Sequence, residues 1–81
     1  KLSIATVSSL TGASLRMLDY WARTKLLRPS GHDANGKGSR RQYTFQDVVA
    51  ILAICKLRER NCPLQKIRIT VRYLKENYPH A

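Results

Sequence analysis

The fold is decided by residues 3–25, whose sequence is SIATVSSLTGASLRMLDYWARTK. Ser3 can cap a first short helix, because its hydroxyl can accept a hydrogen bond from the backbone of the first turn. Gly12 lacks the Cβ that penalises a positive φ, so it can adopt the left-handed conformation that ends this helix. Ser14 can then cap a second helix that extends to about Lys25. Two short helices joined by a tight turn containing glycine are typical of a helix-turn-helix.

The composition points to a polyanionic partner. The 81 residues include 15 Lys and Arg against 5 Asp and Glu, which gives a formal net charge of +10. Such an excess on a small domain is most often met in nucleic-acid-binding proteins, although ribosomal and membrane-surface proteins are basic too. The 43% of hydrophobic residues suffices for a core, which argues against a disordered basic tail. We therefore expect one folded domain over residues 1–81.

The second helix, expected over residues 14–24, has an unusual outward face. Because successive helical residues lie about 100° apart, one face gathers three apolar side chains that we expect to pack inward: Leu15, Leu18 and Ala22. The opposite face and its edges carry Arg16, Met17, Tyr20, Trp21 and Arg23. Arginine, methionine and tyrosine offer a donor for base edges, an apolar contact for a thymine methyl and a phenol for phosphate. The alternative is an ordinary amphipathic helix with Trp21 partly buried beside it.

A basic hairpin is expected over residues 31–43. Asn35-Gly36 is a strong turn dipeptide, because both residues tolerate the positive φ of a type I′ turn. Three cations are concentrated in the same segment: Lys37, Arg40 and Arg41. A flexible basic hairpin suits a wing that lies along the phosphate backbone. The alternative is a disordered loop with incidental charge.

Two further helices are expected after this segment. Thr44 begins the third, with Asp47 in the position of a capping box, and apolar residues on nearly all sides should make it the most buried element. Pro63 suits the first turn of the fourth. The inward stripe of that helix is expected to be Leu64, Ile67, Val71 and Leu74. Ile69 and Tyr73 form a second apolar patch, which suggests a dimer contact. The fold class is therefore expected to be mainly α, a winged helix-turn-helix with about four helices and a small β-hairpin wing.

No catalytic or metal site is indicated. Cys55 lies in an apolar run and Cys62 in a turn, and no second ligand pair stands at metal-binding spacing. His32 and His80 have no evident orienting partner, so we expect neither an enzyme nor a bound cofactor. The longest apolar run, Val48 to Cys55, is shorter than the roughly 20 residues that span a bilayer. Two cysteines without a disulfide scaffold favour the reducing cytoplasm.

The ordered set of motifs resembles the DNA-binding domain of the MerR family of bacterial transcription regulators. The resemblance runs from about Ser3 to Tyr73. The residues that carry it are Leu10-Thr11-Gly12, Ser14-Leu15-Arg16-Met17-Leu18, Tyr20-Trp21, Leu26-Leu27-Arg28-Pro29, Asn35-Gly36 and Arg40-Arg41-Gln42-Tyr43. Each piece is common, and it is their order and spacing that point to the family.

The resemblance implies a site for double-stranded promoter DNA, with the second helix in the major groove. The side chains nearest the bases would be Ser14, Arg16 and Met17. The side chains on the DNA backbone would be Tyr20, Trp21, Arg40, Arg41 and Tyr43. Two residues depart from the family pattern: Asp19 stands where many relatives carry a basic residue, and Tyr20-Trp21 replaces the common tyrosine pair.

The resemblance also implies a homodimer on pseudo-palindromic DNA, joined by a long helix and followed by a sensor domain. Both of these parts would lie beyond Ala81. We therefore expect the reading portion of a cytoplasmic, nucleoid-associated regulator. Two alternatives are an excisionase-like DNA-architectural protein and an RNA- or protein-interaction module that uses the same basic surface.

Overall fold

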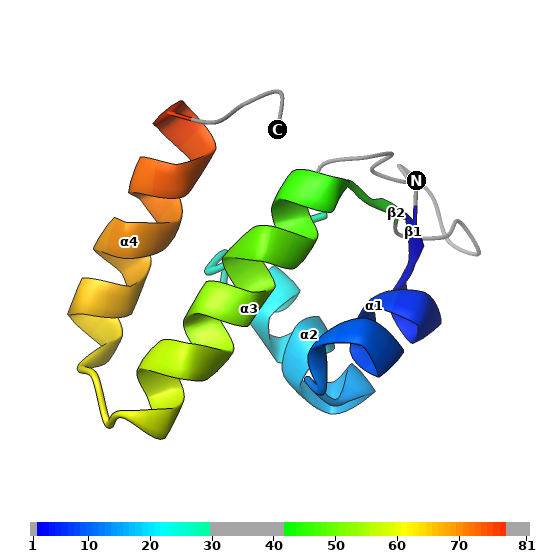
Figure 1. Cartoon of the computed structure of the whole chain (residues 1–81), viewed down its shortest axis with the longest axis horizontal. Coiled ribbons are helices and arrows are strands. Elements are labelled where there is room, and N and C mark those ends of the chain that lie inside the picture. Colours follow the sequence, from blue (N-terminus) through cyan, green and yellow to red (C-terminus); the bar gives the residue numbers. More distant parts are fainter. Residues whose placement is uncertain (1, 30–41, 78–81) are drawn as a thin grey trace.

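The computed structural model describes residues 2–29 and 42–77. Within these residues the chain forms, in order, β1 (Leu2–Ser3), α1 (Ile4–Thr11), α2 (Leu15–Arg23), β2 (Gln42–Tyr43), α3 (Phe45–Glu59) and α4 (Leu64–Asn77) (Figure 1). The expected fold class is confirmed: the described part is mainly helical, with a small antiparallel sheet consistent with a winged helix-turn-helix.

The helix-turn-helix forms as the sequence predicts. Ser3 caps α1 and Ser14 caps α2, each by accepting a hydrogen bond from the backbone N–H three residues on, at 3.2 and 3.0 Å. Gly12 ends α1 with a φ of +83°, and its N–H donates to the Ser8 carbonyl at 2.9 Å. An L side chain rarely adopts this conformation, which explains why glycine occupies the corner. The corner sets where α2 begins relative to α1.

The sheet joins the N-terminal residues to the entrance of α3. β1 and β2 pair antiparallel, with Leu2 opposite Tyr43 and Ser3 opposite Gln42. The strand that follows the expected wing is therefore anchored against the start of the chain. The predicted Asn35-Gly36 hairpin lies outside the described residues.

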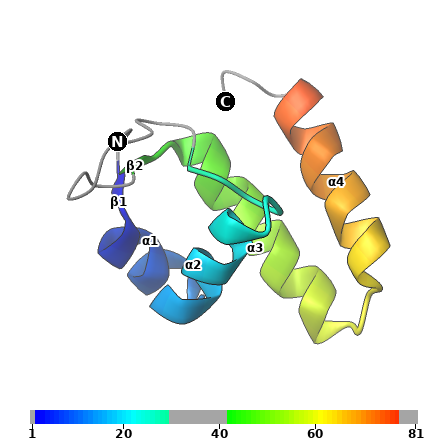
Figure 2. The ribbon, with the colours of Figure 1, turned by 180° about the vertical axis from the view of Figure 1, so that it is seen from behind.

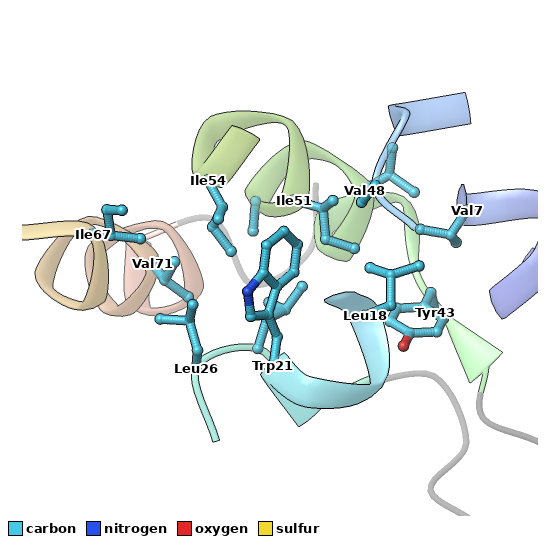
Figure 3. Packing of buried hydrophobic residues seen from close by; sticks show 13 residues of the cluster. Val7, Leu18, Trp21, Leu26, Tyr43, Val48, Ile51, Ile54, Ile67 and Val71 are labelled. Carbon is cyan, nitrogen blue, oxygen red and sulfur yellow. The ribbon is translucent and has the colours of Figure 1, made fainter. Parts of the chain in front are cut away.

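The helix α3 is the centre of the core. Figures 1 and 2 show it with α4 along one side and with α1 and α2 packed across the other. Its Ile51 and Ile54 are fully buried. Figure 3 shows the indole of Trp21 directed from α2 toward these two side chains. The buried residues of all four described helices thus form one cluster around α3.

Two of the inward predictions are wrong. Leu15 and Leu64 are 53% and 56% exposed. Each is the first residue of its helix, where fewer neighbouring side chains are available than in the middle. Val49 and Leu52 are also exposed, so α3 is not buried on all sides. It nevertheless carries more buried residues than any other described helix, as expected.

The start of α3 is fixed by a buried carboxylate. Thr44 and Asp47 form a complete capping box, in which Asp47 Oδ2 accepts the Thr44 backbone N–H at 2.9 Å. The other oxygen, Oδ1, accepts from Lys75 Nζ of α4 at 2.6 Å, and the Asp47 side chain has no exposed surface. A buried charge must be paired and hydrogen-bonded to be tolerated. Asp47 therefore ties the first turn of α3 to the last turns of α4.

Replacing this carboxylate should destabilise the fold. Asp47→Ala removes the cap of α3 and leaves the largely buried Lys75 ammonium without this partner, so we expect the free energy of unfolding to fall by about 3 kcal/mol. Urea unfolding followed by circular dichroism measures the change. Asp19→Ala is the matched control, because its 2.9 Å ion pair with Arg23 is well exposed and should contribute less than about 0.5 kcal/mol. Equal losses in the two variants would contradict the assigned role of Asp47.

Candidate nucleic-acid interface

The helix α2 presents a row of exposed polar side chains on its outward face. Arg16, Tyr20 and Arg23 are all exposed, Tyr20 by 56%. These three residues also line one concavity between α2 and the corner that joins α3 to α4. Ser14 is exposed at the N-terminus of the same helix. The structure therefore brings four of the predicted DNA-binding residues together on one element.

The acidic residue on α2 is paired within the helix. Asp19 Oδ2 accepts a hydrogen bond from Arg23 Nε at 2.9 Å, one turn further on. The pair holds the guanidinium of Arg23 beside the carboxylate and offsets its negative charge. Asp19 departs from the family pattern, and this pairing reduces the repulsion that a free carboxylate would exert on a phosphate. Arg16 retains the positive charge at the start of the helix.

Met17 and Trp21 face the protein more than the sequence predicts. Met17 is half-buried and packs against the core, and Trp21 is 5% exposed. The predicted contact of Trp21 with the DNA backbone stays a prediction, and its indole has almost no exposed surface to offer. The spacing of Leu18, Trp21 and Ala22 indicates that Trp21 is buried, because residues three and four apart share one face of a helix.

The expected wing is described only at its last two residues. Lys37, Arg40 and Arg41 lie outside the described residues. Tyr43, in β2, has no exposed surface and belongs to the core. Its predicted contact with phosphate stays a prediction, and its ring has no exposed surface in this structure. Tyr43 instead holds β2 against α1 and α3.

Metal ligands and reactive thiols were also predicted to be absent, and the described residues can be compared with that expectation. Within residues 2–29 and 42–77, no group of three His, Cys, Asp or Glu side chains is placed to hold a metal ion. Burial raises the pKa of the Cys55 thiol above its ordinary value of 9.0, an effect that Arg58 opposes and Glu59 reinforces. A raised pKa disfavours the thiolate, which is the reactive form, and Cys55 packs partly buried against the core. None of the described helices is long and apolar enough to cross a membrane.

Comparison with known proteins identifies the family. Residues 2–74 match the family described as MerR HTH family regulatory protein. The chain belongs to the MerR helix-turn-helix family. Uncharacterized HTH-type transcriptional regulators of Mycobacterium tuberculosis and Mycobacterium bovis are 39% identical to it over 67 residues, which are 83% of this chain and 30% of theirs. The HTH-type transcriptional regulator TnrA of Bacillus subtilis is 38% identical over 58 residues, which are 72% of this chain and 49% of TnrA.

The family is described as one of helix-turn-helix regulatory proteins, and these relatives are named as transcriptional regulators. The chain matches less than half the length of these relatives. No solved structure matches the chain.

The MerR-type fold also brings in residues that sequence reasoning missed. Arg58, near the end of α3, and Asn61, in the following corner, line the same concavity as Arg16 and Tyr20. The sequence presented them only as a polar end to the third helix. Arg58 is separated by 42 residues from Arg16 in the chain, so the helical periodicity of either segment could not reveal that the two are neighbours.

Adjacent aromatic residues on α2 should respond in opposite ways to truncation. Trp21→Ala opens a cavity in the core and should lower the free energy of unfolding by about 3–5 kcal/mol. Tyr20→Ala removes an exposed side chain and should change stability by less than about 0.5 kcal/mol, while weakening DNA binding. Thermal unfolding and fluorescence anisotropy with labelled duplex DNA separate the two effects. A strongly destabilised Tyr20→Ala variant would show that the outward face is misassigned.

Proposed function

We propose that this chain binds double-stranded promoter DNA in a sequence-specific manner, as the reading domain of a transcription regulator. The helix α2, with its caps at residues 14 and 24, would enter the major groove, and residues 31–43 would lie along the backbone. One observation carries the proposal: Arg16, Tyr20 and Arg23 stand exposed on the outward face of the second helix of a helix-turn-helix. In this motif the second helix is the one that reads base edges, mainly through its N-terminal residues.

The chemistry of the α2 face suits base reading at its N-terminus and backbone contact further on. The guanidinium of Arg16 can donate two parallel hydrogen bonds to O6 and N7 of a guanine, the commonest specific contact in the major groove. The hydroxyl of Ser14 accepts from Met17 N–H at 3.0 Å and keeps its own proton to donate to DNA. Tyr20 and Arg23 lie one and two turns after Arg16, where a helix that leaves the groove would meet phosphates.

The remaining charge supports affinity more than specificity. A net charge of +10 favours DNA of any sequence, because each neutralised phosphate releases condensed counterions. Lys37, Arg40 and Arg41 are proposed to contribute in this way. Base reading by α2 would then act on a complex that charge has already formed.

We also propose that the regulator acts as a homodimer on DNA. A single α2 offers few side chains to base edges, and proteins of this type read two half-sites about one helical turn apart. Two copies of the same face would double the number of base contacts.

The proposal predicts a loss of specificity when the first arginine of α2 is removed. Arg16→Ala should reduce the discrimination between selected and random duplex by about 1–3 kcal/mol, because one bidentate base contact is lost. The test duplex is the sequence enriched from a random duplex pool by the 81-residue chain. Lys56→Ala is the control, since it removes one positive charge from an exposed position on α3. An unchanged ratio of affinities in Arg16→Ala would refute the assigned reading helix.

The enriched sequence also tests the rival functions and the mode of assembly. A palindrome supports a dimer, and a direct repeat indicates head-to-tail stacking. Tighter binding to single-stranded RNA than to any duplex would favour an RNA-binding module. DNA bending without enrichment of any sequence would favour the excisionase-like architectural role.

A backbone contact should behave differently from a base contact. Arg41→Ala should weaken binding to selected and random duplex nearly equally. It should also lower the slope of log K against log salt concentration by about one unit, if one phosphate contact is lost. Fluorescence anisotropy titrations between low and moderate salt measure both quantities. A selective loss of binding to the selected duplex would place Arg41 on a base.

A further inference from the structure

We propose that Arg58 of α3 is a positioning residue for DNA reading, because it fixes the rotation of α2 about its own axis. This inference rests on the proposed function of the α2 face. Two contacts carry it. Arg58 Nη1 lies 3.7 Å from Met17 Sδ as a hydrogen-bond donor, and the guanidinium carbon lies 5.8 Å from the centroid of the Trp21 ring. A single guanidinium thus touches two residues of the reading helix that stand one turn apart.

The two contacted residues define a line along α2. Met17 and Trp21 are four positions apart, so they share one face of the helix. Arg16 and Tyr20, the exposed pair, each precede one of them by a single residue, or about 100° of rotation. A contact that holds both Met17 and Trp21 therefore also sets the direction in which Arg16 and Tyr20 point.

Base reading requires side chains to be placed to within about 1 Å, so the rotation of α2 about its axis is important. Helical side chains end about 5–6 Å from the helix axis, so a rotation of about 10° moves them by about 1 Å. A hydrogen bond loses its favourable range over a displacement of that size. The core side of α2 is held by the buried side chains of Leu18, Trp21 and Ala22, and we propose that Arg58 fixes the last few degrees of rotation that apolar packing alone leaves open. The guanidinium of Arg58 lies over the ring of Trp21, so it acts on the same indole that the core holds.

The chemistry of arginine suits the task better than that of lysine. A planar guanidinium can lie over an aromatic face while its N–H groups donate in the plane, whereas an ammonium is a compact point charge. Arg58 is exposed, which leaves its contacts accessible to substitution without opening the core. Its neighbour Arg60 carries the same charge in the same corner of the molecule and is likewise exposed.

The rival role for Arg58 is direct contact with a phosphate. It shares a concavity with Arg16 and Arg23, and a cation there would attract the DNA backbone. The two roles differ in what they change. A phosphate contact strengthens binding to every sequence and adds about one unit to the salt slope. A positioning contact strengthens binding to the selected sequence alone and leaves the slope unchanged.

The test compares Arg58→Met with Arg60→Met, and Arg58→Lys serves as the conservative variant. Each protein is titrated with the duplex enriched from the random pool and with a scrambled duplex of the same composition. Arg58→Met should lower the ratio of the two affinities about tenfold with an unchanged salt slope. Arg58→Lys should restore part of the ratio, and Arg60→Met should leave it as in the wild type.

Trp21 is the single tryptophan of the chain, so its fluorescence reports directly on the contact. The emission of free Arg58→Met should differ from that of the wild type, and the emission of Arg60→Met should not. Thermal unfolding checks that all three variants are folded, and the conservative Arg58→Lys keeps the comparison available should Arg58→Met prove unstable.

Three outcomes would overturn the positioning role. The first is an unchanged ratio of affinities in Arg58→Met. The second is an equal loss of affinity for both duplexes with a reduced salt slope. The third is Trp21 emission that does not change on the substitution. Failure of the proposed function looks different, because the wild-type protein itself would then not discriminate between the selected and scrambled duplexes. In that case both proposals fall together.

Discussion

The burial of one indole determines which surface of α2 faces outward. Trp21 is 5% exposed and points from α2 toward Ile51 and Ile54 of α3 (Figure 3). Burial of a ring of this size sets the coarse rotation of the nine-residue helix, because turning the ring outward would expose apolar surface and open a cavity. Once that setting is chosen, Arg16 and Tyr20 must point away from the core. The packing of the core and the exposure of Arg16 and Tyr20 therefore depend on one constraint.

The indole can act in this way only because α3 is a fixed support. The Thr44–Asp47 capping box sets the start of α3, and the 2.6 Å ion pair between Asp47 and Lys75 binds that start to α4. At the other end of α3, Arg58 reaches across to Met17 and Trp21. One helix is thus held at its first turn by a buried charge and is connected at its last turn to the reading helix. The polar contacts lie at the two ends, and the apolar core occupies the middle.

The sequence predicted the features that depend on local chemistry and missed those that depend on neighbours. Helix caps at Ser3, Ser14 and Thr44 and the positive φ of Gly12 follow from short-range rules, and the structure confirms each of them. The side chains of Trp21 and Tyr43 were assigned to DNA because the family pattern places aromatic residues there, yet both are in the core. An aromatic residue at the edge of an amphipathic stripe satisfies either role, and only the position of α3 decides between them. The contacts of Arg58 arise across about forty residues of sequence and leave no periodic signal in either segment.

The same geometry explains why charge and specificity must come from different residues. The net charge of +10 would act on every DNA sequence, whereas in the proposed function discrimination would come from the few side chains that α2 presents to base edges. One or two bidentate contacts, at about 1–3 kcal/mol each, reach at most the lower half of the roughly 4–10 kcal/mol that separates specific from non-specific binding by regulators. In the proposed homodimer, two domains on two half-sites would add their contacts, provided that α2 has the same orientation in each copy. A contact that fixes the rotation of α2 would therefore act twice in a dimer, and its loss would misplace the exposed side chains of both copies.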